Sequence, residues 1–65
     1  MKEWYEIYEV KTNGRVRKVD EDARLGYMQV VLGTLATYPN SNVAYYYIKD
    51  NKGHMINFVR IKKIR

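Results

Sequence analysis

Few side chains in this sequence could perform covalent chemistry. A hydrolase needs a nucleophile with a base to activate it, two positioned carboxylates, or a metal ion. The chain has no cysteine, one serine (Ser41) and one histidine (His54). Ser41 follows Pro39 among turn-forming residues, and His54 adjoins Gly53, so both suit ordinary turn roles. We therefore expect no catalytic residues and no enzymatic activity.

Three adjacent acids, Asp20, Glu21 and Asp22, offer the oxygen ligands that divalent cations prefer. They precede an apolar run that begins at Leu25, and acids in this position are typical of a helix start, where they cap free N–H groups. We expect a helix cap rather than a metal site. No glycine belongs to a GxGxxG or GxxxxGK[ST] phosphate-binding pattern, so the sequence predicts no cofactor either.

Cationic and aromatic residues are the more informative ones. The net charge of +5 is unevenly distributed along the chain. Residues 49–65 sum to +5 and residues 10–19 to +4, residues 25–48 carry no charge, and the rest of the chain is negative. Lysine and arginine neutralise phosphates and aromatic rings stack on bases, so the combination indicates a surface that binds DNA or RNA. The predicted nucleic-acid-binding residues are Arg15, Arg17, Lys18, Tyr45, Tyr47, Lys49, Arg60, Lys62 and Lys63.

The same residues also allow a second interpretation. Alternation along a strand separates Arg17 from Lys18 and Lys62 from Lys63, so only about half of these charges share one face. Lysine and arginine on edge strands also prevent aggregation, and tyrosine and arginine are enriched in protein interfaces. The alternative function is therefore a protein-binding inhibitor or adaptor with an acidic partner, or a homo-oligomeric interaction module.

The size of the chain predicts a single domain over residues 1–65 with a thin core. A hydrophobic content of 46% is too high for a disordered chain. Glutamates interrupt the N-terminal segment where a signal peptide would be apolar, and no apolar stretch is long enough to span a bilayer. We expect a cytoplasmic protein that does not associate with a membrane.

The segment from Glu3 to Thr12 is rich in strand-forming residues and ends at Asn13-Gly14, a strong hairpin signal. A two-residue turn there would pair Glu9 with Lys18. The face predicted as core then holds Trp4, Tyr8, Val10 and Val19. The opposite face holds Tyr5, Ile7, Glu9, Lys11, Val16 and Lys18. The spacing of three between the glutamates of this segment leaves a helix as the alternative.

A helix is predicted next, because Leu25, Met28, Leu32 and Leu35 recur at helical spacing until Pro39 ends the element. A strand is the alternative, since adjacent valines and two glycines also suit one. The helix would be apolar nearly all round, which is typical of a helix covered on more than one side.

Gly26, Val30 and Gly33 form a narrow stripe on this predicted helix, where another backbone could approach closely. We expect this stripe to be an oligomer interface and the protein to be a homodimer. The alternative is that the stripe packs against the protein's own sheet.

The last third of the chain predicts a second hairpin. Residues 50–53 fit a type I turn whose closing glycine, Gly53, takes a left-handed conformation. That register places Tyr46 opposite Phe58 in the core and directs Tyr45 and Tyr47 away from it. The predicted fold is α+β, a small antiparallel four-stranded sheet with one helix in the order β-β-α-β-β; a small all-β barrel is the alternative. The strand order decides whether the two basic segments meet or lie apart.

Overall fold

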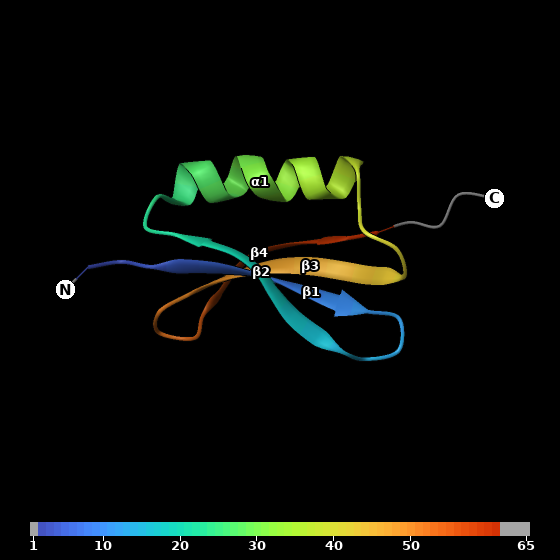
Figure 1. Cartoon of the computed structure of the whole chain (residues 1–65). Coiled ribbons are helices and arrows are strands. Elements are labelled where there is room, and N and C mark those ends of the chain that lie inside the picture. Colours follow the sequence, from blue (N-terminus) through green and yellow to red (C-terminus); the bar gives the residue numbers. More distant parts are fainter. Residues whose placement is uncertain (1, 62–65) are drawn as a thin grey trace.

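One helix rests on one face of a four-stranded antiparallel sheet in the computed structural model, which describes residues 2–61 (Figure 1). The elements are β1 (Tyr5–Lys11), β2 (Val16–Asp22), α1 (Leu25–Thr37), β3 (Val43–Asp50) and β4 (Met55–Arg60). This arrangement confirms the α+β fold in the order β-β-α-β-β. The sheet is open, so the barrel alternative is wrong. No helix of the described residues is both long enough and apolar enough to cross a membrane.

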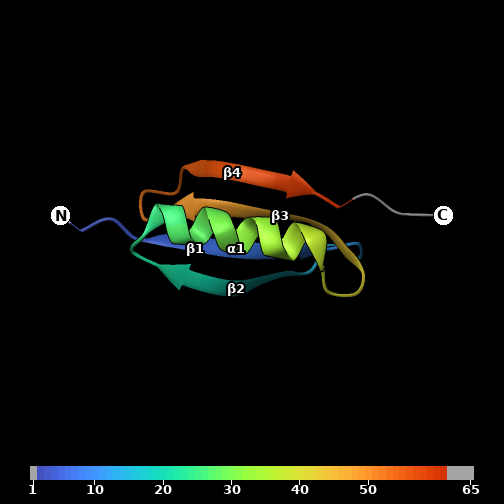
Figure 2. The ribbon, with the colours of Figure 1, turned by 90° about the horizontal axis from the view of Figure 1, so that it is seen from above.

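The strand order is β2-β1-β3-β4, so β1 and β3 pair at the centre and β2 and β4 form opposite edges (Figure 2). The chain reaches β3 from the β2 edge through α1, which lies along the sheet. Among the described basic residues, Arg17 and Lys18 on β2 therefore lie at the opposite edge of the sheet from Arg60 on β4.

The first hairpin has a different turn from the predicted one. Glu9 is opposite Arg17, not Lys18, because the loop contains three residues, 12–14, and not two. Gly14 has a φ of 91°, whereas Asn13 has no positive φ, which the predicted two-residue turn would require. A register shift next to Ile7 then changes the pairing further along the hairpin.

The core lies between β1, β3 and α1. Its buried hydrophobic residues are Tyr5, Ile7, Met28, Leu32, Val43, Tyr46 and Ile48. The core face predicted for β1 is therefore wrong: Tyr5, Ile7 and Glu9 face the helix, and of the predicted set only Val19 packs against the core. This face can be buried although it carries Glu9, because partners within the fold satisfy the carboxylate.

The second hairpin agrees with the prediction at its turn and departs from it beyond. Gly53 has the expected positive φ of 86°, and Lys49 is opposite Met55. A register shift next to Lys49 then places Phe58 opposite Tyr47 instead of Tyr46. Tyr46 is buried as predicted, but Phe58 is 53% exposed, so its predicted core position is wrong.

Helix α1 confirms the helical periodicity, and the strand alternative is wrong. The predicted acidic cap is also wrong, because residues 20–22 are the last residues of β2 and pair with β1. Arg24 occupies the N-cap position and its side chain makes no capping hydrogen bond. Asp22 instead accepts hydrogen bonds from the backbone N–H and the guanidinium of Arg24, at 2.8 and 2.9 Å, which connects the strand to the helix.

Candidate nucleic-acid interface

Four aromatic side chains lie next to one another on the sheet face opposite α1. This aromatic row consists of Tyr8 on β1, Tyr47 and Tyr45 on β3, and Phe58 on β4. Tyr8 and Tyr47 stack with ring centroids 5.5 Å apart, and Tyr47 and Tyr45 are 6.1 Å apart. Tyr45 and Phe58 meet nearly at right angles, with centroids 6.4 Å apart. The row therefore crosses three strands of the open face.

The alternation of β3 explains why this row forms. Tyr46 points into the core, where its hydroxyl oxygen accepts a hydrogen bond of 3.0 Å from the backbone N–H of Asn40. Tyr45 and Tyr47, on either side, must then point to the opposite face. Antiparallel pairing places Tyr8 and Phe58 on the two sides of Tyr47, which brings rings from three strands together.

The charges on the open face are unevenly distributed. On the β1–β2 side, Lys18 lies 3.0 Å from a carboxylate oxygen of Glu21 and 3.6 Å from one of Glu6. The hydrogen bond to Glu21 raises the pKa of the Lys18 ammonium, which stays charged and paired. On the β3–β4 side, Lys49 and Arg60 form no ion pair with any residue of the described range 2–61. Cationic charge is therefore available to an anionic ligand mainly beside β3 and β4.

An open cleft of about 240 Å³ lies at the β3–β4 end of the aromatic row. It is lined by Tyr45, Met55, Phe58 and Arg60. Another cleft, of about 320 Å³, follows β2 and is lined by Lys18, Val19, Asp20 and Glu21. The two carboxylates of that second cleft would repel a phosphate, so the first cleft is the better candidate for an anionic ligand.

The structure brings together five of the nine residues predicted to bind nucleic acid. On the open face are Lys18, Tyr45, Tyr47, Lys49 and Arg60. Arg15 lies next to the first hairpin loop, and Arg17 lies on the helix side of β2. Lys62 and Lys63 lie outside the described residues.

Sequence reasoning missed Tyr8, Phe58 and Met55. A signal for Tyr8 was present in the first loop, which ends at Gly14 and has the same glycine-closed pattern as the loop ending at Gly53. A three-residue loop of this kind sets the register in which Tyr8 is opposite Lys18. For Phe58 and Met55 no local signal exists, since the register shift in the second hairpin leaves no mark in its turn residues.

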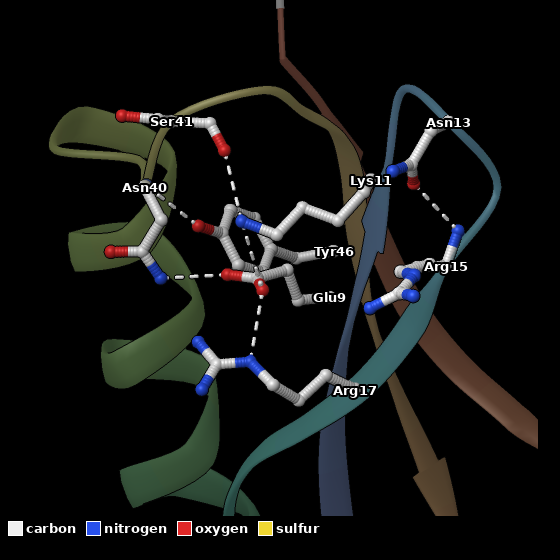
Figure 3. A network of polar contacts seen from close by, with 8 residues as sticks. All are labelled: Glu9, Lys11, Asn13, Arg15, Arg17, Asn40, Ser41 and Tyr46. Atoms are coloured by element: carbon white, nitrogen blue, oxygen red, sulfur yellow. Dashed lines mark hydrogen bonds and ion pairs between the residues drawn. The ribbon is translucent and has the colours of Figure 1, made fainter.

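Arg17 is engaged in a polar cluster around the fully buried Glu9 (Figure 3). The carboxylate of Glu9 accepts hydrogen bonds from the amide of Asn40 at 2.6 Å and from Arg17 at 3.2 Å, and the Lys11 ammonium lies 3.5 Å away. Burial by itself would raise the pKa of Glu9, but these hydrogen bonds and charges outweigh it and leave the pKa below its ordinary value. The cluster binds the 38–42 loop to the sheet, so its role is structural.

Ser41 and His54 have separate partners in the structure. The Ser41 carbonyl accepts a hydrogen bond from Lys11, and the His54 imidazole is largely exposed, 3.5 Å from Asp50. Within residues 2–61, no three histidine or acidic side chains are grouped so that they could hold a metal ion.

The predicted oligomer stripe lies on the outer surface of α1. Gly26, Val30 and Gly33 are exposed, and a Cβ built at either glycine meets no atom within 4 Å. The alternative that this stripe packs against the protein's own sheet is therefore wrong. Val30 is 68% exposed, and α1 contains no charged residue.

Comparisons of the chain with protein-family models, with curated proteins and with solved structures find no match. The interpretation of the open face therefore depends on its own geometry and charge.

Proposed function

We propose that this protein is a small, basic, non-enzymatic protein that binds nucleic acid, DNA or RNA, through the open face of its sheet. The observation that carries the proposal is the aromatic row next to Lys49 and Arg60, two cations that form no ion pair with any residue of the described range 2–61. Ring faces stack on bases of any sequence, and cationic groups bind the phosphates between them. We also propose the cytoplasm as the place of action.

The net charge of +5 supports the proposal, because a positive protein attracts a polyanion over a distance of several ångströms. The binding surface differs from the one that the sequence predicted. Arg17 forms an ion pair with Glu9, and Arg15 lies near the opposite edge of the sheet from Arg60. The β3–β4 half of the open face is the proposed contact region.

The test is fluorescence anisotropy of labelled DNA and RNA oligonucleotides, titrated with the protein at low salt. Binding is expected to weaken steeply between about 50 and 200 mM salt, as counterion release requires. A protein of similar size and net charge but without exposed aromatic rings serves as the control for non-specific attraction. If the protein binds neither single strands nor duplexes at the lowest salt, the proposal is wrong.

Self-association through α1 is a second proposed property. The outer stripe of Gly26, Val30 and Gly33 is free of charge and exposed, so a second copy could pack its own helix against it and form a homodimer. In this arrangement both open sheet faces remain accessible on the outside of the dimer. Light scattering coupled to size exclusion measures the mass directly, and a monomer at high concentration would contradict this second proposal.

A further inference from the structure

The cleft at the end of the aromatic row is small and lined largely by flat or soft apolar groups. Its volume is about 240 Å³, and its walls include the rings of Tyr45 and Phe58 and the thioether of Met55. Pockets for drug-sized ligands have volumes of roughly 300–1,000 Å³. The space therefore suits a single planar ring system.

The rings of the aromatic row differ in how accessible they are to a ligand. Tyr47 lies between Tyr8 and Tyr45, and the ammonium of Lys49 lies 5.0 Å from the centre of the Tyr8 ring. Phe58 contacts one ring of the row, that of Tyr45, nearly edge to face, and it is 53% exposed on an edge strand. Phe58 is therefore the ring with a face most available for stacking.

Arg60 supplies the charge at this cleft. It lies directly across from Tyr45 in the sheet, and among residues 2–61 it forms no ion pair. A guanidinium group binds phosphate oxygens through two parallel N–H donors, and it also stacks on planar groups. A planar ring attached to a phosphate fits both these walls and this charge, and a nucleotide has this chemistry.

We propose, building on the nucleic-acid-binding function above, that this cleft holds one unpaired base of a single strand. The base stacks on Phe58, and the adjoining phosphate binds Arg60. A base inside a duplex is stacked on both faces and paired at its edge, so it cannot enter the cleft without being extruded. The protein consequently prefers single strands to duplexes.

The test compares three labelled oligonucleotides of about twelve nucleotides, within the range of known single-strand sites: a mixed-sequence single strand, its duplex, and an abasic strand with the same phosphates. Anisotropy titrations at low salt should show the tightest binding for the mixed-sequence strand. Phe58→Ala should weaken that binding by roughly 5- to 150-fold, the usual effect of losing one stacked base, and leave the abasic strand unaffected.

Matched variants separate stacking from folding. Phe58→Leu retains an apolar side chain but removes the ring face, so it should weaken binding as Phe58→Ala does while the far-ultraviolet circular dichroism stays native. Val16→Ala removes a side chain that is similarly exposed, at 55%, on the opposite edge strand, and it should leave the affinity unchanged.

Each adverse result has a distinct meaning. Equal affinity for the abasic and the mixed-sequence strand, with no effect of either Phe58 variant, overturns the base site and leaves the nucleic-acid-binding function standing. Absence of binding to any strand overturns both. If polyglutamate displaces the single strand at an equal concentration of charges, the cleft recognises acidic chains in general, as an acidic protein partner would require, and the base site is wrong.

Discussion

At the level of single residues, three consecutive tyrosines have two different surroundings. Tyr46 is fully buried beneath α1, whereas Tyr45 and Tyr47 belong to the aromatic row on the open face. The hydroxyl of Tyr46 also accepts the backbone N–H of Asn40, so this tyrosine supports both the core and the loop that follows α1. Stability and binding should therefore depend on different members of the run.

Replacement of Tyr46 by alanine is expected to lower the free energy of unfolding by about 3–5 kcal/mol, because it leaves a cavity in the core. Tyr47→Ala removes two ring contacts on the open face, each worth about 0.5–1.5 kcal/mol, and should therefore cost about 1–3 kcal/mol. Urea denaturation followed by circular dichroism measures both. A larger loss for Tyr47→Ala than for Tyr46→Ala would mean that β3 presents the opposite face to the helix.

Glu9 is the residue whose role is least apparent from its type. Glu9→Gln keeps the shape but removes the charge that Arg17 and Lys11 face, so we expect a loss of about 1–3 kcal/mol near neutral pH. The pKa of Glu9 in the folded state is lowered, so its contribution is complete above the ordinary glutamate pKa of 4.5 and is lost as the pH falls through the folded value.

Urea denaturation of wild type and Glu9→Gln at neutral and acidic pH checks this prediction. The difference in unfolding free energy between the two proteins should shrink as the pH falls. Some acid dependence will remain in the variant, because the pKa of Asp22 is lowered to about 2 by its hydrogen bonds with Arg24. A difference that stays constant with pH would show that the Glu9 charge does not contribute.

At the level of elements, the two hairpin loops have the same construction. Each contains three residues and closes with a glycine of positive φ, Gly14 in the first hairpin and Gly53 in the second. The side-chain oxygens of Asn13 and Asp50 each accept a backbone N–H two residues further on, which supports the turns. The two loops therefore have the same geometry although the strands of the two hairpins differ in composition.

Gly14→Ala should destabilise the protein by about 1–2 kcal/mol, the cost of a left-handed conformation for a residue with a side chain. The space around Gly14 is open, so the effect isolates backbone strain from steric contact. Thermal denaturation followed by circular dichroism measures it. Unchanged stability would indicate that the loop relaxes to another turn type in the variant.

Gly33→Ala is the matched substitution in α1. In a monomer it should stabilise the helix by about 1 kcal/mol, because a Cβ there meets no other atom and alanine favours the helix. If two helices pack at this stripe, the added methyl group would instead hold them apart. Light scattering and denaturation of the variant therefore distinguish the two states: a gain in stability with unchanged mass argues against a dimer through this stripe.

The elements were predictable because their signals are local. The spacing of Met28 and Leu32 indicates the helix, and Gly53 indicates its turn without reference to the rest of the chain. The positions of Glu9 and Phe58 were not predictable in this way. The burial of Glu9 depends on Asn40, which is 31 residues away, and the exposure of Phe58 depends on a register shift that packing imposes within the second hairpin.

On the scale of the whole molecule, the strand order separates the basic residues of β2 from Arg60 on β4, whose relative positions the sequence did not determine. The β2 edge combines its cations with acids: Lys18 pairs with Glu21, and Arg17 pairs with Glu9. The β4 edge carries Arg60 beside an aromatic cleft without an ion pair among the described residues. Lys18 and Arg17 are thus neutralised within the fold, whereas Arg60 has no ion-pair partner among residues 2–61.

Arg60→Ala should consequently weaken binding to a single strand and reduce the slope of log K against log salt by about 0.7, the value for the loss of one phosphate contact. Arg15→Ala removes the same charge from an exposed position near the opposite edge, so it should change the affinity little and leave the slope nearly unchanged.

Both variants have the same net charge, and a common effect of overall electrostatics would therefore lower the affinity of both equally. Anisotropy titrations over a series of salt concentrations measure the two slopes. Equal losses would show that the protein attracts nucleic acid by its total charge alone, and a larger loss for Arg15→Ala would transfer the contact region to the β2 edge.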